Sequence, residues 1–479
     1  MIKYIKKYFF VFLILLSLPI LANESENIND LALIPINYSE VIRKDSKFNE
    51  DFGKEEFEIG IKEVLNFAEK QNLDILSSYY EAEASKGAYW SSFGSLLPSM
   101  TLQSSREDFQ GGEIITFAQP VSLDRITYRH MSMISYRMPL GGKTFFRVLA
   151  GKNDYDYNLA QYSSTSQKVI AQALMDYFSW YKDMAEIMLA EQSIKETEEQ
   201  LKAITARVKS GFGTKLELMQ TQSLLLERQN TKLEAQKKEK LSQKTLINDL
   251  NLGPNFRLKP KISEMSPLLF LDTEENILDD FIEEAYNNRP DLLALDQEIK
   301  YNKNLYRQVR SDLLPNVSLS AYYRRIGQEK NYKELDESTQ NMISIDWDLM
   351  KSFGPETIGA IKSYKDKVKQ SETNRDKQIN EIERTVSEAF YNVRLFKEQM
   401  EVDHKKILAA EEAYRLADVR MKSGFGLNLD LIKAQTDLTK ARFDYTNSII
   451  EYNKAQIRLL YESGLINSKD ILEISMWGE

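Results

Sequence analysis

The sequence of 479 residues contains no cysteine and only two histidines. Without cysteine a disulfide framework is excluded, and so is a lipid anchor attached through a thiol. The histidines, His130 and His404, have no partners at the spacing of a metal site or a catalytic triad. We therefore expect no metal, no cofactor and no enzymatic activity.

A basic surface and a phosphate-binding loop are also missing. The formal net charge is −9 at pH 7, whereas non-specific nucleic-acid binding needs a basic face, so we expect no nucleic-acid partner. The sequence Gly-Phe-Gly at residues 211–213 lacks the further glycine and the lysine of a nucleotide site. Charged residues occur mostly in mixed-sign helical stretches, which indicates solvated helix surfaces.

Long apolar runs are absent except at the N-terminus. Three lysines precede an apolar run from Tyr8 to Ile20, and Ala22 follows it. This pattern predicts a secretory signal peptide over residues 1–22, because the run is shorter than a membrane span. Residues 23–55 are polar and are interpreted as a loose leader. A membrane form of the mature chain would have to use strands, since no later stretch resembles a spanning helix.

The most informative positive feature is an internal repeat. The pentapeptide Lys-Ser-Gly-Phe-Gly occurs at residues 209–213 and again at 422–426, an offset of 213 residues. At the same offset Tyr177 corresponds to Phe390, and the flanking positions agree in apolar character. Leu-Leu-Pro sequences ending at Pro98 and Pro315 are 217 residues apart, which one small insertion explains. The chain is therefore interpreted as an internal duplication.

Both halves predict the same order of elements, namely helix, β-hairpin, long helix, glycine turn and helix. The predicted segments are a first repeat at 56–254, a connector at 255–284, a second repeat at 285–464 and a C-terminal tail at 465–479. Hairpins are expected at 98–139 and 315–350. Helices are expected at 57–67, 72–97, 147–210, 214–251, 291–314, 357–423 and 427–462. In each repeat the two shorter helices add up to about the length of the long one, which predicts that they stack end to end along it.

The second hairpin alternates between apolar and polar residues. In a soluble sheet its apolar face would meet a core, and in an outer-membrane barrel it would meet lipid, so the alternation leaves both open. Four strands per chain cannot close a barrel, because single-chain barrels start at about eight strands. A trimer would supply twelve, which suits a solute pore better than the eight of a dimer. The candidates for lipid-facing residues are Val317, Leu319, Ile343, Ile345 and Trp347.

These features together resemble the TolC family of outer-membrane efflux channels over nearly the whole mature chain. The resemblance rests on the duplicated order of elements, the two Leu-Leu-Pro sequences, the Asn-Arg-Pro-Asp-Leu sequence at 288–292, and Arg-x-x-x-Gly at 207–211 and 420–424. It implies a mainly α protein with a β-barrel part in outer-membrane lipid and an α-helical barrel crossing the periplasm. It also implies a homotrimer that docks to a periplasmic adaptor and an inner-membrane pump.

The resemblance places a gate at the helical tips. By position, Glu217 matches the family's carboxylate after the first turn, and Asp430 matches the first carboxylate of its constriction. Lys433 stands where a second acid is expected, and Met421 and Gly426 occupy the places of the aromatic and arginine lock partners.

Glu217 is therefore a candidate to pair instead with Arg420, Lys422 or Lys433, and the alternative is an ordinary salt-bridged helix surface. The turns themselves are candidates for docking the adaptor; their residues are Gly211, Phe212, Gly213, Gly424, Phe425 and Gly426.

The function expected from these features is a passive conduit of a tripartite efflux or type I secretion system, extending from the outer membrane into the periplasm. The alternative is a periplasmic coiled-coil scaffold without channel activity. Two hairpins with alternating faces favour the channel, because a scaffold does not need them. The sequence leaves drug efflux and polypeptide secretion open.

Overall fold

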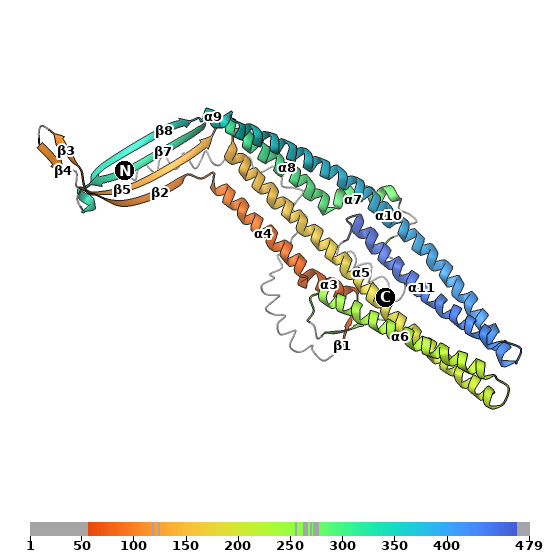
Figure 1. The fold of residues 1–479 in the computed structure, drawn as a ribbon. Coiled ribbons are helices and arrows are strands. Elements are labelled where there is room, and N and C mark those ends of the chain that lie inside the picture. The colour runs from red at the N-terminus through yellow and green to blue at the C-terminus, as the bar shows by residue number, and fades with distance from the viewer. Residues whose placement is uncertain are drawn as a thin grey trace. The chain divides into compact units, whose positions relative to one another are not determined.

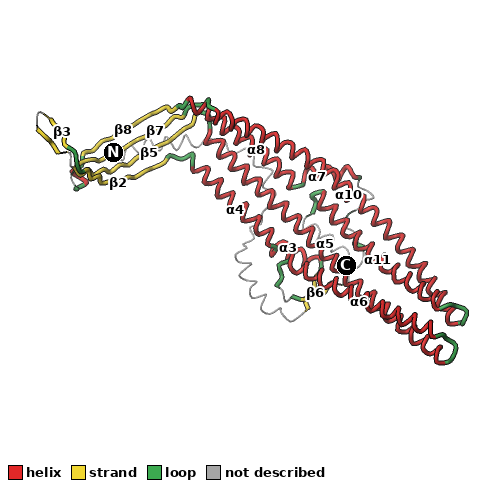
Figure 2. The backbone as a smooth tube through the Cα atoms, viewed as in Figure 1, coloured by secondary structure: helices red, strands yellow, loops and turns green. Residues whose placement is uncertain are grey.

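In the computed structural model the described residues are 56–116, 119–122, 125–253, 256–261, 267–268, 271, 277–328 and 330–466. The predicted signal peptide and leader lie outside them, as does most of the predicted tail. From Glu56 on, the chain forms one unit of long helices with a β-sheet at one end and two helical turns at the other (Figure 1, Figure 2). Among the described residues, no helix combines the length and the apolar character needed to cross a membrane.

Each repeat is built around one very long helix. Two shorter helices pack along it, and a small helix packs near its middle. The first repeat contains α3 (Ile61–Gln71), α4 (Leu73–Gly94), α5 (Lys143–Lys209) and α6 (Lys215–Asp249). The second contains α7 (Leu278–Asn288), α8 (Pro290–Arg310), the short α9 (Leu349–Ser352), α10 (Pro355–Lys422) and α11 (Asn428–Glu462). The predicted mainly α fold with long paired helices is confirmed.

The predicted equality of helix lengths is wrong. Helices α4 and α6 comprise 22 and 35 residues, 57 together, against 67 in α5. In the second repeat α8 and α11 comprise 21 and 35 residues, 56 together, against 68 in α10. The difference lies mainly next to the sheet. There α4 ends at Gly94 and α8 at Arg310, three and four residues before their predicted ends, and α5 begins at Lys143, four residues before its predicted start.

The two hairpins combine into a single four-stranded antiparallel sheet with the order β2-β5-β7-β8. The strands are β2 (Ser99–Phe109), β5 (Arg125–Pro139), β7 (Asn316–Gly327) and β8 (Asp336–Asp346), and β5 pairs with β7 across the repeats. Two short strands, β3 (Glu113–Thr116) and β4 (Gln119–Ser122), extend the first hairpin and were not predicted.

The predicted lipid-facing residues of the second hairpin share one face of the sheet. Val317 lies opposite Ile345, and Leu319 lies opposite Ile343, so the four side chains project to the same side. Ile343 and Ile345 are 75% and 69% exposed in the single chain, so the described residues leave these two side chains largely uncovered. The prediction that Trp347 belongs to this strand is wrong, because β8 ends at Asp346 and Trp347 lies just beyond it. The side chain of Asp348 accepts a hydrogen bond from the Lys351 N–H and starts α9 there.

A two-stranded parallel sheet lies beside the helices, where a helix was predicted. Residues Glu56–Ile59 form β1, which pairs with β6 (Arg257–Pro260). The predicted helix at 57–67 therefore begins only at Ile61, where Gly60 donates its N–H to the carboxylate of Glu63. The predicted boundary between residues 284 and 285 falls inside α7, because the apolar side of this helix packs as one unit against α10.

The buried core residues of the first repeat have buried counterparts at the equivalent positions of the second. Tyr177 and Trp180 on α5 are buried, as are their counterparts Phe390 and Val393 on α10. The ring of Phe390 packs on Phe281 of α7, with 5.8 Å between centroids. The small helices thus anchor the middle of each long helix, and the tips extend away from this core (Figure 1).

Candidate functional site at the helical tips

Both helical hairpins end in the same backbone turn. Gly211 and Gly424 have φ angles of 80° and 82°, a region that favours glycine because it has no Cβ. The N–H of Phe212 donates to the carbonyl of Arg207, and the equivalent bond joins Phe425 to Arg420, at 2.9 and 3.1 Å. These are the hydrogen bonds of a Schellman cap, so Arg-x-x-x-Gly marks the last helical turn and its left-handed residue.

The arginine of the first turn connects the two tips. The guanidinium of Arg207 donates to the carbonyl of Met421 at 3.1 Å, and also to the carbonyl of Phe212 at 3.4 Å. Met421 itself is buried against Ile204 and Leu431. The repeat equivalent of Arg207, Arg420, is exposed. Within one chain, therefore, a single arginine binds carbonyls of both turns.

The helices that leave the two turns are capped differently. Thr214 and Glu217 form a capping box: the Glu217 N–H donates to the Thr214 hydroxyl at 3.2 Å, and the Thr214 N–H donates to the Glu217 carboxylate at 2.8 Å. In the second repeat the same two positions hold Leu427 and Asp430, and Leu427 has no side chain that can cap the helix. Asp430 is exposed, as is Lys433 one turn later.

The expected partners of Glu217 are not its partners within one chain. Its carboxylate caps α6, and among the described residues it forms no ion pair with Arg420, Lys422 or Lys433. Lys422 instead pairs with Asp418, four residues earlier on α10, at 2.7 Å. The physical reason is local, because a capping box and an i,i+4 pair need no distant element to form.

A row of polar side chains joins α5 to α11 above the tips, and we call it the α5–α11 seam. Gln200 donates to Asn428 at 3.0 Å, Gln435 donates to Thr197 at 3.2 Å, and Arg442 pairs with Glu196 at 3.1 Å. Asn428 also donates to Thr221 of α6, at 3.2 Å. These side chains are buried or half-buried, so the two helical hairpins meet through hydrogen bonds as well as apolar packing.

The α5–α11 seam is incompletely satisfied within one chain. Buried oxygen atoms of Ser193, Gln200 and Gln435 lack hydrogen-bond partners among the described residues. A buried polar group without a partner costs about 1–3 kcal/mol, which offsets part of what the seam's other bonds contribute. These three oxygens therefore weaken the seam relative to one in which every buried polar atom is bonded.

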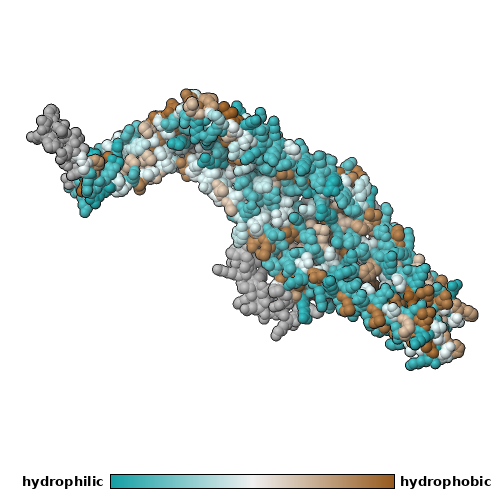
Figure 3. All heavy atoms as spheres, viewed as in Figure 1, coloured by the Kyte–Doolittle hydropathy of each residue, from teal (hydrophilic) through white to brown (hydrophobic). Residues whose placement is uncertain are grey.

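The outermost surface of the tips is apolar. Phe212 and Phe425 are 82% and 92% exposed, and Leu216, Leu427 and Leu429 are also exposed. Figure 3 shows apolar side chains gathered at this end of the molecule. Contiguous exposed apolar patches are typical of protein–protein contact sites.

Sequence reasoning located the turns but predicted no residue of the seam. Asn428, Gln435 and Arg442 recur every seven residues on α11, a spacing that places them on one face of the helix. This seven-residue spacing can be recognised in the sequence. The bond from Arg207 to a carbonyl is not, because a backbone acceptor leaves no residue signature.

Comparison with known proteins identifies the family. The family model described as "Outer membrane efflux protein" matches residues 64–251 and 281–462. The alkaline protease secretion protein AprF of Pseudomonas aeruginosa is 22% identical over 368 residues, covering 73% of this chain and 72% of the relative. The proteases secretion protein PrtF of Dickeya chrysanthemi is 22% identical over 311 residues, covering 63% of this chain and 66% of the relative, just under two thirds of its length.

A solved structure agrees in fold. The Campylobacter jejuni CmeC outer membrane channel superimposes with a TM-score of 0.73 at 15% identity, covering 87% of this chain and 89% of that one. The matched family segments contain both tips and the α5–α11 seam, and each begins and ends within a repeat. The chain therefore belongs to the outer membrane efflux protein family and is an outer-membrane channel protein of the efflux and secretion class.

Proposed function

We propose that this protein is a homotrimeric passive conduit, gated at its helical tips by parting of the α5–α11 seam. Channels of this family work with an adaptor and an inner-membrane pump in tripartite systems. We extend both partners to this chain and assign adaptor docking to the exposed apolar residues of the two turns. Proteins of the family are channels and not enzymes, and we propose the same of this chain.

The unpaired edges of the sheet support the proposal of a trimer. Its outer strands, β2 and β8, each have one edge that pairs with nothing among the described residues. A strand edge of eleven residues is a template for pairing with another chain. In a ring of copies, β2 of one chain meets β8 of the next in antiparallel orientation, so three chains close twelve strands. The exposed face around Ile343 and Ile345 would then meet lipid.

The gate is supported by the polar character of the contact between the two helical hairpins. The α5–α11 seam is polar and partly unsatisfied, so water can replace its bonds when the hairpins separate. Arg207 and Asn428 hold the closed arrangement in place of the lock residues that this chain lacks. Asp430 would repeat around the axis of the trimer at the entrance.

The test is the mass and conductance of the protein extracted from outer membranes in detergent. We expect a particle with the mass of three chains that conducts ions in a planar bilayer. A monomer that still conducts would end this proposal. Release of the protein from membranes by a carbonate wash would favour the periplasmic scaffold instead.

A polypeptide cargo is favoured by the two curated relatives, since both are named for protease secretion. The protein can be expressed in a strain that lacks its own outer-membrane channel but carries a protease exporter's pump and adaptor. Protease activity in the medium would support secretion. Restored drug resistance without secreted protease, in a matched strain carrying a drug pump and its adaptor, would assign efflux.

A further inference from the structure

The long helices of one chain form columns, and the two outer columns each have an open side. Helix α5 packs against two columns, one formed by α4 and α6 and the other by α8 and α11. Helix α10 packs against the α8–α11 column but not against the α4–α6 column, and Figure 1 shows α4 and α10 on opposite sides of the molecule. These open sides continue the unpaired edges of the sheet, because α4 leads into β2 and β8 leads into α10.

Positions that are covered on the inner helices are open on the outer ones. At the repeat offset of 213 residues, Phe178 of α5 corresponds to Tyr391 of α10, and the two are 1% and 58% exposed. Gln435 of α11 is buried in the α5–α11 seam, whereas its equivalent on α6, Gln222, is exposed. The duplication therefore indicates what is missing, namely a column that covers α10 as the α8–α11 column covers α5.

Two contacts near the sheet show how α8 covers α5 within one chain. The guanidinium of Arg307 lies 5.9 Å from the ring centroid of Phe146, and Asn304 donates to Asn153 at 2.8 Å. The α5 residues have equivalents on α10 at the offset of 213, and the α8 residues have equivalents on α4 at the offset of 217. These equivalents lie on the two open sides, so they do not meet within one chain.

The equivalents of Phe146 and Arg307 have complementary sizes. Gly359 of α10 stands in the place of Phe146, and a Cβ at Gly359 would have no described atom within 4 Å. Trp90 of α4 stands in the place of Arg307 and is 64% exposed. The ring that is absent at Gly359 leaves room for a large side chain from a facing helix, and an indole fits this space as a large residue packs opposite a small one.

A second glycine on α4 supports the same contact. Gly87 is equivalent to Asn304, whose partner Asn153 corresponds to Asp366 of α10. It lies inside α4, where glycine destabilises a helix relative to alanine, and no described atom lies within 4 Å of its Cβ position. Gly87 and Trp90 are three residues apart and share one face of α4. The close approach of another helix would account for a glycine that the described part of the chain does not require.

Toward the tips the open sides are apolar. Leu395 and Val402 of α10 are 55% and 57% exposed, and Leu233 of α6 is 63% exposed. Their equivalents line one small cavity between α5 and α11; these are Lys182, Leu189 and Thr446. Leu395 and Val402 are seven residues apart, the spacing of a coiled-coil stripe, so Leu233 of a facing helix would pack between them.

We propose that α10 of one copy packs against α4 and α6 of the next, in the register in which α5 packs against α8 and α11 within one chain. Trp90 of one copy then lies against Gly359 of the next. Leu233 lies likewise against Leu395 and Val402. The inference rests on the homotrimer of the proposed function and adds to it which faces meet and in which register. A second copy is the occupant, because these sides repeat the contacts that the chain already makes with itself.

Cross-linking of the full-length protein in outer membranes tests the register, and the sequence has no native cysteine to interfere. Thr197 and Gln435 are hydrogen-bonded at 3.2 Å within the chain, and their equivalents are Ala410 and Gln222. With a short thiol cross-linker, Ala410→Cys with Gln222→Cys should link copies into covalent dimers and trimers on denaturing gels.

The matched control is Ala410→Cys with Ser223→Cys, which moves one thiol about 100° around α6. We expect the control to link about tenfold or more slowly, because its thiols are not held in proximity. Equal rates in the two variants, or no link between copies in either, would overturn the proposal.

A size swap tests the contact near the sheet. Gly359→Phe fills the space assigned to Trp90 and should lower the temperature at which the trimer dissociates in detergent. Adding Trp90→Arg recreates the pair that Phe146 and Arg307 form within the chain and should restore that temperature at least in part. No loss in Gly359→Phe, or no recovery in the double variant, would contradict the contact. A native mass other than three chains would end the homotrimer and the inference together, whereas a trimer that fails the cross-linking test would end only the register.

Discussion

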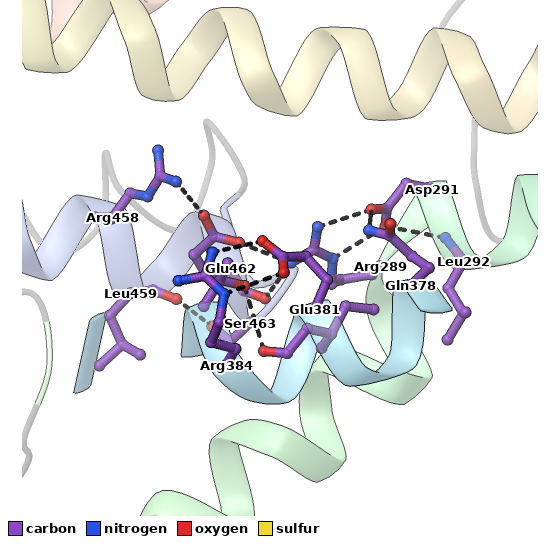
Figure 4. A network of polar contacts seen from close by, with 12 residues as sticks. Arg289, Asp291, Leu292, Gln378, Glu381, Arg384, Arg458, Leu459, Glu462 and Ser463 are labelled. Atoms are coloured by element: carbon purple, nitrogen blue, oxygen red, sulfur yellow. Dashed lines mark hydrogen bonds and ion pairs between the residues drawn. The ribbon is translucent and has the colours of Figure 1, made fainter. Parts of the chain in front are cut away.

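The first and second repeats share a backbone and differ in how their polar groups are neutralised. We call the place where α6 meets α4 the first joint, and the place where α11 meets α8 the second. At the second joint Arg289 pairs with the carboxylates of Glu462 and Asp291 (Figure 4), whereas at the first the equivalent residue is the uncharged Asn72, which donates to the Asp249 carbonyl. At the turns the order is reversed, because the first repeat has a complete capping box and the second has Leu427 in its place. Comparing the two repeats therefore distinguishes the features that both share, which the fold requires, from the charges and caps that only one repeat has.

The shared features are those that set the backbone. Both turns retain a glycine at positive φ, both joints retain a left-handed residue, and both long helices retain a buried aromatic residue near the middle. The features that differ are charges and caps near the tips and joints. The predictions below test these differences one at a time.

The largest effect is expected at the second joint. Arg289→Ala leaves the carboxylates of Glu462 and Asp291 without their cation in a largely buried site, which should cost about 3–5 kcal/mol. Asn72→Ala at the first joint removes the cap of α4 and the bond to the Asp249 carbonyl but leaves no charge unpaired, and it should cost about 2 kcal/mol. Thermal unfolding of the two variants in detergent measures the difference. Equal losses would show that the two joints are energetically alike.

The two faces of the sheet should differ nearly as much. Ile343→Lys places a charge on the face assigned to lipid and should cost about 2–4 kcal/mol if it lies near the midplane. Ser344→Lys, one residue along on the opposite face, should be tolerated. Unfolding of the protein from lipid vesicles compares the two. Equal tolerance would reject the assignment of the faces.

A smaller effect is expected at the turns. Thr214→Ala removes the cap of α6 and should cost about 1 kcal/mol, whereas Leu427→Thr installs a cap on α11 and should contribute a similar amount. Hydrogen exchange in the first turns of α6 and α11 reports both changes separately. A loss of protection at α11 on Leu427→Thr would show that Leu427 has a packing role in the turn that outweighs capping.

The smallest effect is expected at the entrance. Asp430→Ala should lower the preference for cations a few-fold in bilayer recordings, and Lys433→Asp should raise it, because each residue recurs in every copy around the axis. Glu217→Gln is the matched control, since its carboxylate is already engaged in the capping box. Unchanged selectivity in both Asp430→Ala and Lys433→Asp would place these residues away from the constriction.

The sequence predicted the elements that have a periodic or repeated signal. The long helices, the glycine turns and the alternating hairpin strands follow from patterns in neighbouring residues, and the structure has them within a few residues. The parallel strand at Phe57 was missed because its partner, β6, lies about two hundred residues away. Within one chain, the predicted partners of Glu217 are not its partners for the opposite reason, since a cap three residues away satisfies this carboxylate. Contacts to backbone carbonyls, such as those of Arg207 and Arg289, leave no pattern in a single sequence.

Cross-linking across the tips tests the gate most directly, and the absence of native cysteine makes the background clean. Thr221→Cys with Asn428→Cys joins the two hairpins at a hydrogen-bonded pair, whereas Glu186→Cys with Lys238→Cys joins α5 to α6 within one hairpin. With a short thiol cross-linker, conductance measured with adaptor and pump present should be lost in the first variant, should return when the link is reduced, and should be unaffected in the second. Full conductance in the cross-linked Thr221–Asn428 variant would contradict a gate that opens by parting the hairpins.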